Sequence, residues 1–280
     1  MKGKGFVLGL TAFFCGVLTA ISSSVVLAQT GDEVLRQDKE RSEASRLWEQ
    51  VIEAKGGREK LHSISNMLRS KSPGQIELYV YPNLYWEWDK GKIVHSYLWI
   101  RLSNMDRGVY VVATDQGIAS FKKDLDSKGR ANYRESNLMD ACAFLLETKW
   151  LQPSPTRVTR EIVNKKQYDV IHTRFPDLAV YKDWGLDFFI EPETHEVKLV
   201  RDYSVPYGEG GVWTFDDYIS VDGIQMPRKV NGFISMEEMG RFHKGKCCAF
   251  SYRFNVAYNS TLFDVVPTEA AGPDAWKPRP

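Results

Sequence analysis

Hydrophobic and polar residues alternate along most of this chain, with the period of two that is typical of β-strands that bury one face. The clearest case is residues 249–258, where Phe250, Tyr252 and Phe254 alternate with Ser251 and Arg253. Tight turns that contain Gly or Asp separate such segments, which favours an antiparallel meander. We predict strands at residues 75–81, 84–89, 92–102, 109–114, 118–121, 157–164, 167–174, 186–191, 197–204, 212–220, 224–234 and 249–258.

Two segments carry the three- and four-residue spacing of amphipathic helices instead. The first begins at Ser42 and ends at Gly56-Gly57, with one or two further turns at residues 58–64. The second spans residues 137–150, with Asn137 as the expected N-cap and two prolines after it. The apolar stripe of the first helix consists of Ala44, Leu47, Trp48, Val51 and Ile52.

These elements predict a mainly β (α+β) fold. A sheet of ten to twelve strands twists and curls, because flat sheets of that size are unusual. We therefore expect a curled antiparallel sheet that forms an incomplete β-barrel, covered by the N-terminal helix and one inserted helix. The concave face of such a sheet is either a filled core or a ligand cavity.

The N-terminus is typical of a secretory signal peptide. Lys2 and Lys4 precede an uncharged apolar run at residues 6–21, and the small residues Val26 and Ala28 suit cleavage after Ala28. An uncleaved anchor helix is the alternative, although the run is shorter than the roughly 20 residues that span a bilayer. We expect an exported, periplasmic protein with no transmembrane span in the mature chain.

The remaining chain divides by pattern into three parts. A polar leader at residues 29–41 precedes a single domain at residues 42–266, in which residues 125–155 form a helical insertion. A proline-rich tail follows at residues 267–280. The 37 Lys and Arg residues nearly balance the 36 Asp and Glu residues, so no charge excess calls for a nucleic-acid partner.

Export places three cysteines in a compartment that permits disulfides. They are Cys142, Cys247 and Cys248, an odd number of which two are adjacent. The sequence allows either one disulfide bond from Cys142 to Cys247 or Cys248, or three buried thiols without a bond. So few cysteines exclude a disulfide-held scaffold, and a hydrophobic core must stabilise the fold.

Four stretches resemble exported bacterial proteins with the LolA-like fold, a group that includes outer-membrane lipoprotein-sorting proteins. The first is the amphipathic opening at residues 47–61, and the second is the hairpin from Phe188 to Arg201 with its Glu191-Pro192 turn. The third runs from Trp213 through Asp222-Gly223 to Pro227, and the fourth comprises residues 254–256 with 262–263. The resemblance covers about residues 42–267. It implies an incomplete barrel whose apolar interior holds acyl chains in the lipoprotein carriers.

The resemblance directs attention to the bulky apolar positions of the strands. If the concave face is a cavity, we expect these residues to line it; if it is not, they fill the core. They are Leu78, Val80, Trp86, Trp88, Leu98, Ile100, Phe188, Ile190, Trp213, Phe215, Met226, Phe254 and Val256.

Catalytic patterns are missing from the sequence. No Gly-x-Ser-x-Gly, His-Glu-x-x-His or Gly-x-x-x-x-Gly-Lys-Ser/Thr motif occurs. His243 with Cys247 and Cys248 lacks an evident fourth ligand for a metal ion. We predict neither catalysis nor a metal or cofactor.

Two functions remain. The first is a monomeric envelope protein that binds a lipid or a lipoprotein acyl chain non-covalently, with an envelope protein as a further possible partner. The alternative is a non-catalytic interaction or structural module with a filled core.

Overall fold

The computed structural model describes residues 15–71, 74–89, 99–114, 117–204, 208–241 and 248–263. Several sequence predictions therefore lie outside the described residues. These are the first half of the signal peptide, the start of the predicted strand 92–102, the His243 and Cys247 positions, and the tail at residues 267–280.

The described strands form one antiparallel sheet of 13 strands in the order β6-β5-β4-β3-β2-β1-β13-β12-β11-β10-β9-β8-β7. The chain therefore builds outward from β1 to β6, crosses over, and returns from β7 to β13 beside β1. Their bounds are β1 Asn66–Lys71, β2 Gln75–Val80, β3 Leu84–Asp89, β4 Trp99–Asn104, β5 Val109–Thr114, β6 Gly117–Lys122, β7 Ser154–Val163, β8 Lys166–Arg174, β9 Trp184–Ile190, β10 Val197–Ser204, β11 Gly208–Val221, β12 Ile224–Phe233 and β13 Cys248–Phe254.

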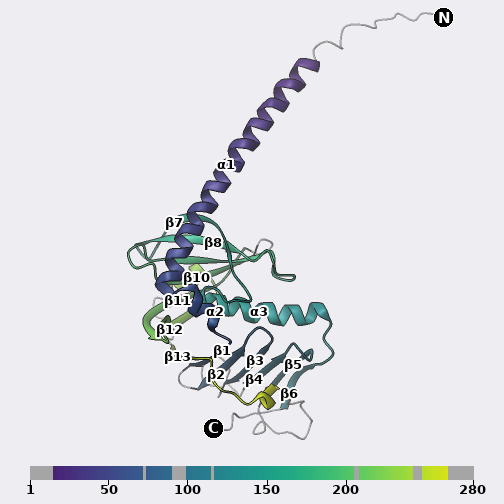
Figure 1. The fold of residues 1–280 in the computed structure, drawn as a ribbon, viewed down its shortest axis with the longest axis vertical. Helices are drawn as coiled ribbons and strands as arrows, with labels where there is room; N and C mark the ends of the chain where they lie inside the picture. Colours follow the sequence, from purple (N-terminus) through teal and green to yellow (C-terminus); the bar gives the residue numbers. More distant parts are fainter. Residues whose placement is uncertain are drawn as a thin grey trace, which may run out of the picture.

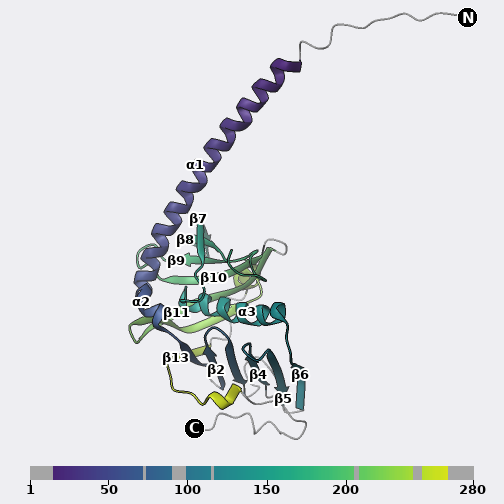
Figure 2. The same ribbon diagram turned by 45° about the vertical axis from the view of Figure 1, so that its right-hand side comes forward.

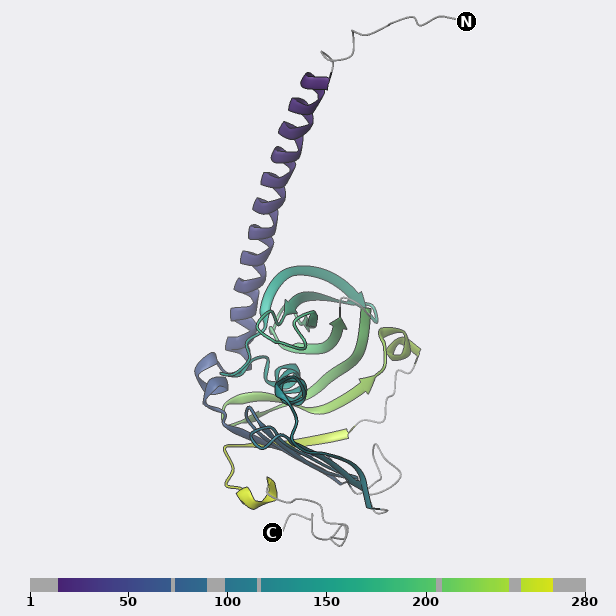
Figure 3. The same cartoon turned by 90° about the vertical axis from the view of Figure 1, so that its right-hand side faces the viewer.

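The sheet has two parts of different shape (Figure 3). Strands β7–β12 coil into a nearly closed roll, which with β13 we call the curled half, and β1–β6 form the flat half. The outer strands β6 and β7 stand at opposite ends of the strand order, so the barrel is incomplete. This arrangement confirms the predicted fold class.

Helix α3 (Ser127–Leu145) lies between the two halves, as the views in Figures 2 and 3 show. Its N-cap is Asp126, whose carboxylate accepts a hydrogen bond from the Gly129 N–H at 2.7 Å. The predicted start at Asn137 was wrong. The preceding turns, residues 127–136, are mostly polar and carry no apolar repeat, so the pattern became visible only where the helix enters the core.

Helix α1 (Cys15–Lys55) is also longer than predicted and projects from the body as a rod (Figure 1). It passes through residues 29–41, so the predicted polar leader is helical, although its side chains at Glu33 to Lys39 are exposed. Ion pairs one turn apart favour helix there: Arg36 lies 2.7 Å from Glu33 and 4.0 Å from Glu40. No helix among the described residues is both long and apolar enough to cross a bilayer.

The end of α1 follows the prediction. Ala44, Trp48, Val51 and Ile52 are buried, and the helix stops before Gly56-Gly57, whose φ angles are 134° and 91°. A Cβ on Gly56 would lie 2.4 Å from the Gly223 carbonyl oxygen, so this position requires glycine for a close approach as well. Helix α2 (Arg58–Ser63) then buries Leu61 and turns the chain into β1.

Turn chemistry and strand positions agree largely with the sequence. Asp222 and Gly223 join β11 to β12 with φ angles of 52° and 79°, as a two-residue hairpin requires. Strand β1 was missed, because it has only two apolar residues in sequence, Met67 and Leu68, at its start. The remaining short helices are α4 (Met236–Arg241) and the 3₁₀-helix η1 (Ser260–Phe263).

Candidate functional site

The thirteen residues expected to line a cavity do not share one face of the sheet. Those of the flat half and Val256 belong to a cluster with Phe263 of η1, on the face turned away from α3. Those of the curled half belong to the main core around α3. The first set is Leu78, Val80, Trp86, Trp88, Ile100 and Val256; the second is Phe188, Ile190, Trp213, Phe215, Met226 and Phe254; Leu98 lies outside the described residues.

Side chains fill the space between the curled half and the helices. Phe188 of β9 packs on Trp48 of α1 with ring centroids 5.0 Å apart. Phe144 of α3 packs on Phe215 and Phe250 at 5.3 and 6.2 Å. Four cavities that described residues line include none of the thirteen predicted residues.

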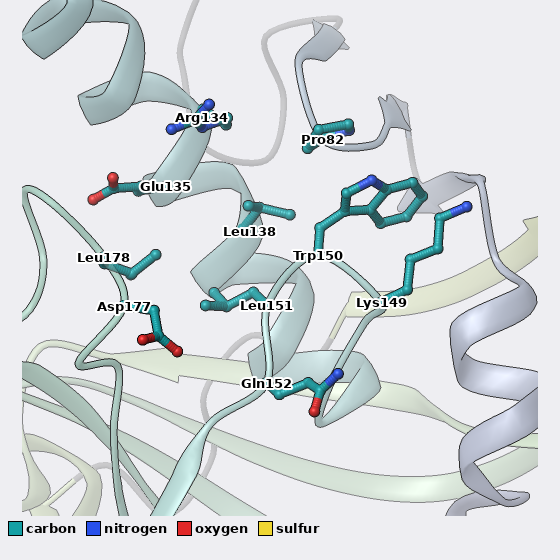
Figure 4. Close-up of a pocket in the computed structure, with 10 residues that line it drawn as sticks. All are labelled: Pro82, Arg134, Glu135, Leu138, Lys149, Trp150, Leu151, Gln152, Asp177 and Leu178. Carbon is teal, nitrogen blue, oxygen red and sulfur yellow. The ribbon is translucent and has the colours of Figure 1, made fainter.

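A cavity of about 460 Å³ opens beside this core, and α3 contributes the exposed Arg134 and the buried Glu135 and Leu138 to its lining. Figure 4 shows its walls, in which Trp150 lies between Pro82 and Lys149. A volume of several hundred Å³ suits a small-molecule ligand. Its lining residues are Pro82, Arg134, Glu135, Leu138, Lys149, Trp150, Leu151, Gln152, Asp177 and Leu178.

One wall is the loop between β8 and β9, which a buried carboxylate fixes to α3. Glu135 accepts hydrogen bonds from the N–H groups of Ala179, Val180 and Tyr181 at 3.0, 2.8 and 3.2 Å. Three backbone donors satisfy the carboxylate and make this loop part of a preformed wall. Leu178 is thereby held over the cavity (Figure 4).

The opposite wall is an aromatic shelf in the turn after α3. The Thr148 hydroxyl oxygen accepts hydrogen bonds from the N–H groups of Trp150 and Leu151 at 3.3 and 3.1 Å. The Trp150 ring packs against Tyr81 with centroids 5.7 Å apart, and the Lys149 ammonium lies 4.4 Å from the Trp150 centroid. The site thus combines an apolar shelf with a cation at its edge.

The flat half meets α3 through ionic contacts in addition to the packing of Met67 and Tyr79 in the main core. Arg69 of β1 donates to Glu77 at 2.5 and 3.0 Å and to Asp140 of α3 at 3.2 Å. Tyr79 donates to the same Asp140 oxygen at 2.5 Å, and Tyr85 donates to Glu77 at 3.1 Å. Although burial opposes ionisation of Glu77, the attraction of Arg69 lowers the pKa of this carboxyl.

Other chemistry expected from the sequence is placed as follows. Cys142 is a buried free thiol whose Sγ lies 3.6 Å from the Leu151 carbonyl oxygen, so it is not in a disulfide. Burial raises the pKa of this thiol well above its usual value, which makes it unreactive. Within the described part of the chain, no three His, Cys, Asp or Glu side chains are grouped as metal ligands would be.

Sequence reasoning missed the lining of the cavity. Its residues come from α3, the turn after it, the β2–β3 turn and the β8–β9 loop, so only the tertiary fold brings them together. Trp150 beside Lys149 was the one local signal, an aromatic residue and a cation at the end of the predicted helix 137–150.

No family model matches the sequence, and no curated protein matches it. Among solved structures it is similar to a DUF1329 family protein from Desulfovibrio piger, with 10% identity, a TM-score of 0.44, and coverage of 79% of this chain and 96% of that one. It is also similar to a putative outer membrane lipoprotein-sorting protein domain from Vibrio parahaemolyticus, with 11% identity, a TM-score of 0.39, and coverage of 79% of this chain and 97% of that one. A third similar structure is a LolA superfamily protein from Nitrosomonas europaea, with 10% identity, a TM-score of 0.41, and coverage of 76% of this chain and 95% of that one.

The last two come from the group that the sequence resembles. At identities of about a tenth and TM-scores below 0.5, the three likenesses carry no argument about function.

Proposed function

We propose that this chain is an exported envelope protein that binds an apolar, acyl-type ligand non-covalently in the cavity beside α3. The observation that carries the proposal is the Trp150 shelf in a cavity of about 460 Å³, with Leu138, Leu151 and Leu178 on its walls. Apolar ligands bind in such concave sites, and a few charged groups at the edge orient them.

Charge at the rim suggests which end of the ligand points outward. Arg134, Lys149 and Asp177 line the cavity and are exposed, so two cations and one carboxylate lie at its rim, and Lys149 is held over the Trp150 ring. A fatty-acid carboxylate at the rim would meet these cations while its chain covers the shelf. Of the strand residues expected as ligand contacts, those of the curled half then act as the core beside the site, and the described ones of the flat half pack separately with Phe263.

The test is ligand loading of the purified protein. Native mass spectrometry after detergent-free purification should detect bound lipid, and a fluorescent fatty acid should bind and quench tryptophan emission. Trp150→Asp should weaken binding at least tenfold by placing a charge on the shelf. Lys149→Glu, at an exposed position where folding is not at stake, should weaken it several-fold.

The matched control is Ile162→Asp, which changes an apolar residue that is 74% exposed on β7, outside the cavity. It should bind like the unmodified protein. A bare polypeptide in the mass spectrum together with no fatty-acid uptake would refute the proposal. The alternative, an interaction module, would then gain support from the filled core between α3 and the curled half.

A further inference from the structure

A ladder of polar side chains crosses the curled half on the face opposite its hydrophobic core. The strand register places Arg157 opposite His172, His172 opposite Asp187, and Asp187 opposite Arg201. Their neighbours along each strand, such as Ile171, belong to the core, and side chains alternate between faces. The four residues therefore form one row on the outer face of β7–β10.

Within this row, the imidazole and the carboxylates already have partners. His172 Nδ1 lies 2.8 Å from Asp187, and His172 Nε2 lies 2.8 Å from the Thr159 hydroxyl. Arg201 binds Glu161 at 3.0 and 3.2 Å and Asp187 at 2.8 and 3.1 Å. Burial opposes ionisation of Asp187, yet the bonds from His172 and Arg201 lower its pKa. The carboxylates of Glu161 and Asp187 are thus both paired with the Arg201 guanidinium.

The next row contains a gap where a side chain is missing. Two residues further along β8 and β9 lie Arg174 and Gly185, and Gly185 stands opposite Tyr203 of β10. A Cβ on Gly185 would lie 2.2 Å from the Thr173 carbonyl oxygen, which is backbone and cannot move aside, and 2.2 Å from Arg174 Nη1, so this position requires glycine. Arg174 lies 5.0 Å from the Tyr203 ring centroid and donates through Nη1 to the Thr173 carbonyl at 3.1 Å.

The two rows enclose a cavity of about 290 Å³. Three arginines and two carboxylates line it, so a positive charge remains when His172 is neutral. Among the described residues, neither Arg157 nor Arg174 makes an ion pair with a carboxylate, and the Tyr203 hydroxyl makes no hydrogen bond. The lining consists of Arg157, Glu161, His172, Arg174, Asp187, Arg201 and Tyr203.

We propose that this cavity binds a phosphate group through Arg157, Arg174 and Tyr203. Guanidinium groups bind oxyanions with two parallel hydrogen bonds, and these donors come from three different strands. Donors from several directions suit a tetrahedral anion better than a planar carboxylate. Thr159 does not line the cavity, so we assign the Thr159–His172–Asp187 chain a supporting role and no catalytic one.

The first measurement is calorimetric titration of the full chain with inorganic phosphate at constant ionic strength. Arg157→Gln, at an exposed position, should weaken binding at least tenfold and leave thermal unfolding unchanged; Arg174→Gln should weaken it similarly. The control is Arg160→Gln on the same strand, because Arg160 pairs with Asp169 at 3.3 Å and lies outside the cavity. The proposal would be overturned by absence of phosphate binding, by an unchanged phosphate affinity in Arg157→Gln and Arg174→Gln, or by tighter binding of acetate than of phosphate.

A second arm separates the two sources of a phosphate group. Vesicles of phosphatidylglycerol should co-sediment the protein in an Arg157-dependent manner if the source is a lipid headgroup. Binding of glycerol 3-phosphate without vesicle binding would assign the site to a soluble phosphate ester. Because this cavity and the Trp150 cavity share no lining residue, Trp150→Asp should leave phosphate binding intact, and the two proposals can fail separately.

Discussion

The two halves of the sheet face α3 in opposite ways. In the curled half, the face toward the helix is apolar. Phe215 packs on Phe144 of α3, and Phe188 packs on Trp48 of α1. In the flat half, the same face carries the Arg69–Glu77 ion pair beside Tyr85, while Leu78, Trp86 and Ile100 lie on the far side with Phe263. One continuous sheet therefore changes the polarity of its inner face near β1.

The two halves therefore bind α3 by different interactions, apolar packing in the curled half and a buried ionic network in the flat half. Apolar packing stabilises through the area removed from water and tolerates some rearrangement. A buried ionic network requires all its partners at once, because a lone buried charge is costly. The flat half should therefore fix the position of α3 through specific partners, whereas the curled half should contribute most of the stability.

The largest effect should come from the apolar side of this comparison. Phe188→Ala removes a fully buried ring from the main core and should lower the free energy of unfolding by about 4 kcal/mol, as measured by urea denaturation. Phe121→Ala, at a side chain that is 40% exposed on β6, is the control and should change it by under about 0.5 kcal/mol. Similar losses in both variants would show that the curled half does not dominate stability.

A somewhat smaller effect is expected on the ionic side. Glu77→Leu leaves Arg69 buried beside Asp140 alone and should cost about 3 kcal/mol in urea denaturation. The double variant Arg69→Met with Glu77→Leu should recover most of that loss, because it removes both charges together. If the double variant is no more stable than the single one, the network acts through shape and not through charge pairing.

The smallest effect concerns Lys55, a buried charge without an ion pair among the described residues. Burial lowers the pKa of its amine to about 7, with Glu196 opposing the shift. The unfolded chain keeps this proton up to about pH 10.5, so stability should rise with pH above 7 and fall as pH drops through 7. Relative to Lys55→Met, the unmodified protein should gain about 1 kcal/mol between pH 7 and 8 in parallel denaturation series.

The control for this comparison is Lys60→Met, since Lys60 is exposed on α2. Its stability should keep the same pH dependence as the unmodified protein. Parallel curves for the unmodified protein and Lys55→Met would show that Lys55 keeps its ordinary pKa in the folded state.

The elements themselves could largely be predicted, because local chemistry determines them. The stripe around Trp48, the stop at Gly56-Gly57 and the turn at Asp222-Gly223 all follow from short-range rules. The inner and outer faces could not be assigned. Alternation in the flat half shows that Leu78 and Glu77 point to opposite sides, but it does not show which side meets a helix.

The cavities were beyond sequence reasoning for another reason. Trp150 and Leu178 line the same cavity only because Glu135 binds the β8–β9 loop, a contact across more than forty residues of sequence. The cavity between Arg157 and Tyr203 depends on Gly185, because any side chain at this position would collide with the Thr173 carbonyl oxygen and with Arg174. Neither feature has a local pattern.

The pairing between β12 and β13 joins only two residue pairs, Lys229 with Ala249 and Val230 with Cys248. It is the shortest pairing that the described strands make, whereas β13 joins β1 through five pairs. Backbone amides beside this seam should exchange with deuterium before those of any interior strand. Only two backbone pairs thus join strands β7–β12 to the rest of the sheet, so the main core, which extends from Phe215 to Met67 and Tyr79, must hold the two parts of the sheet together.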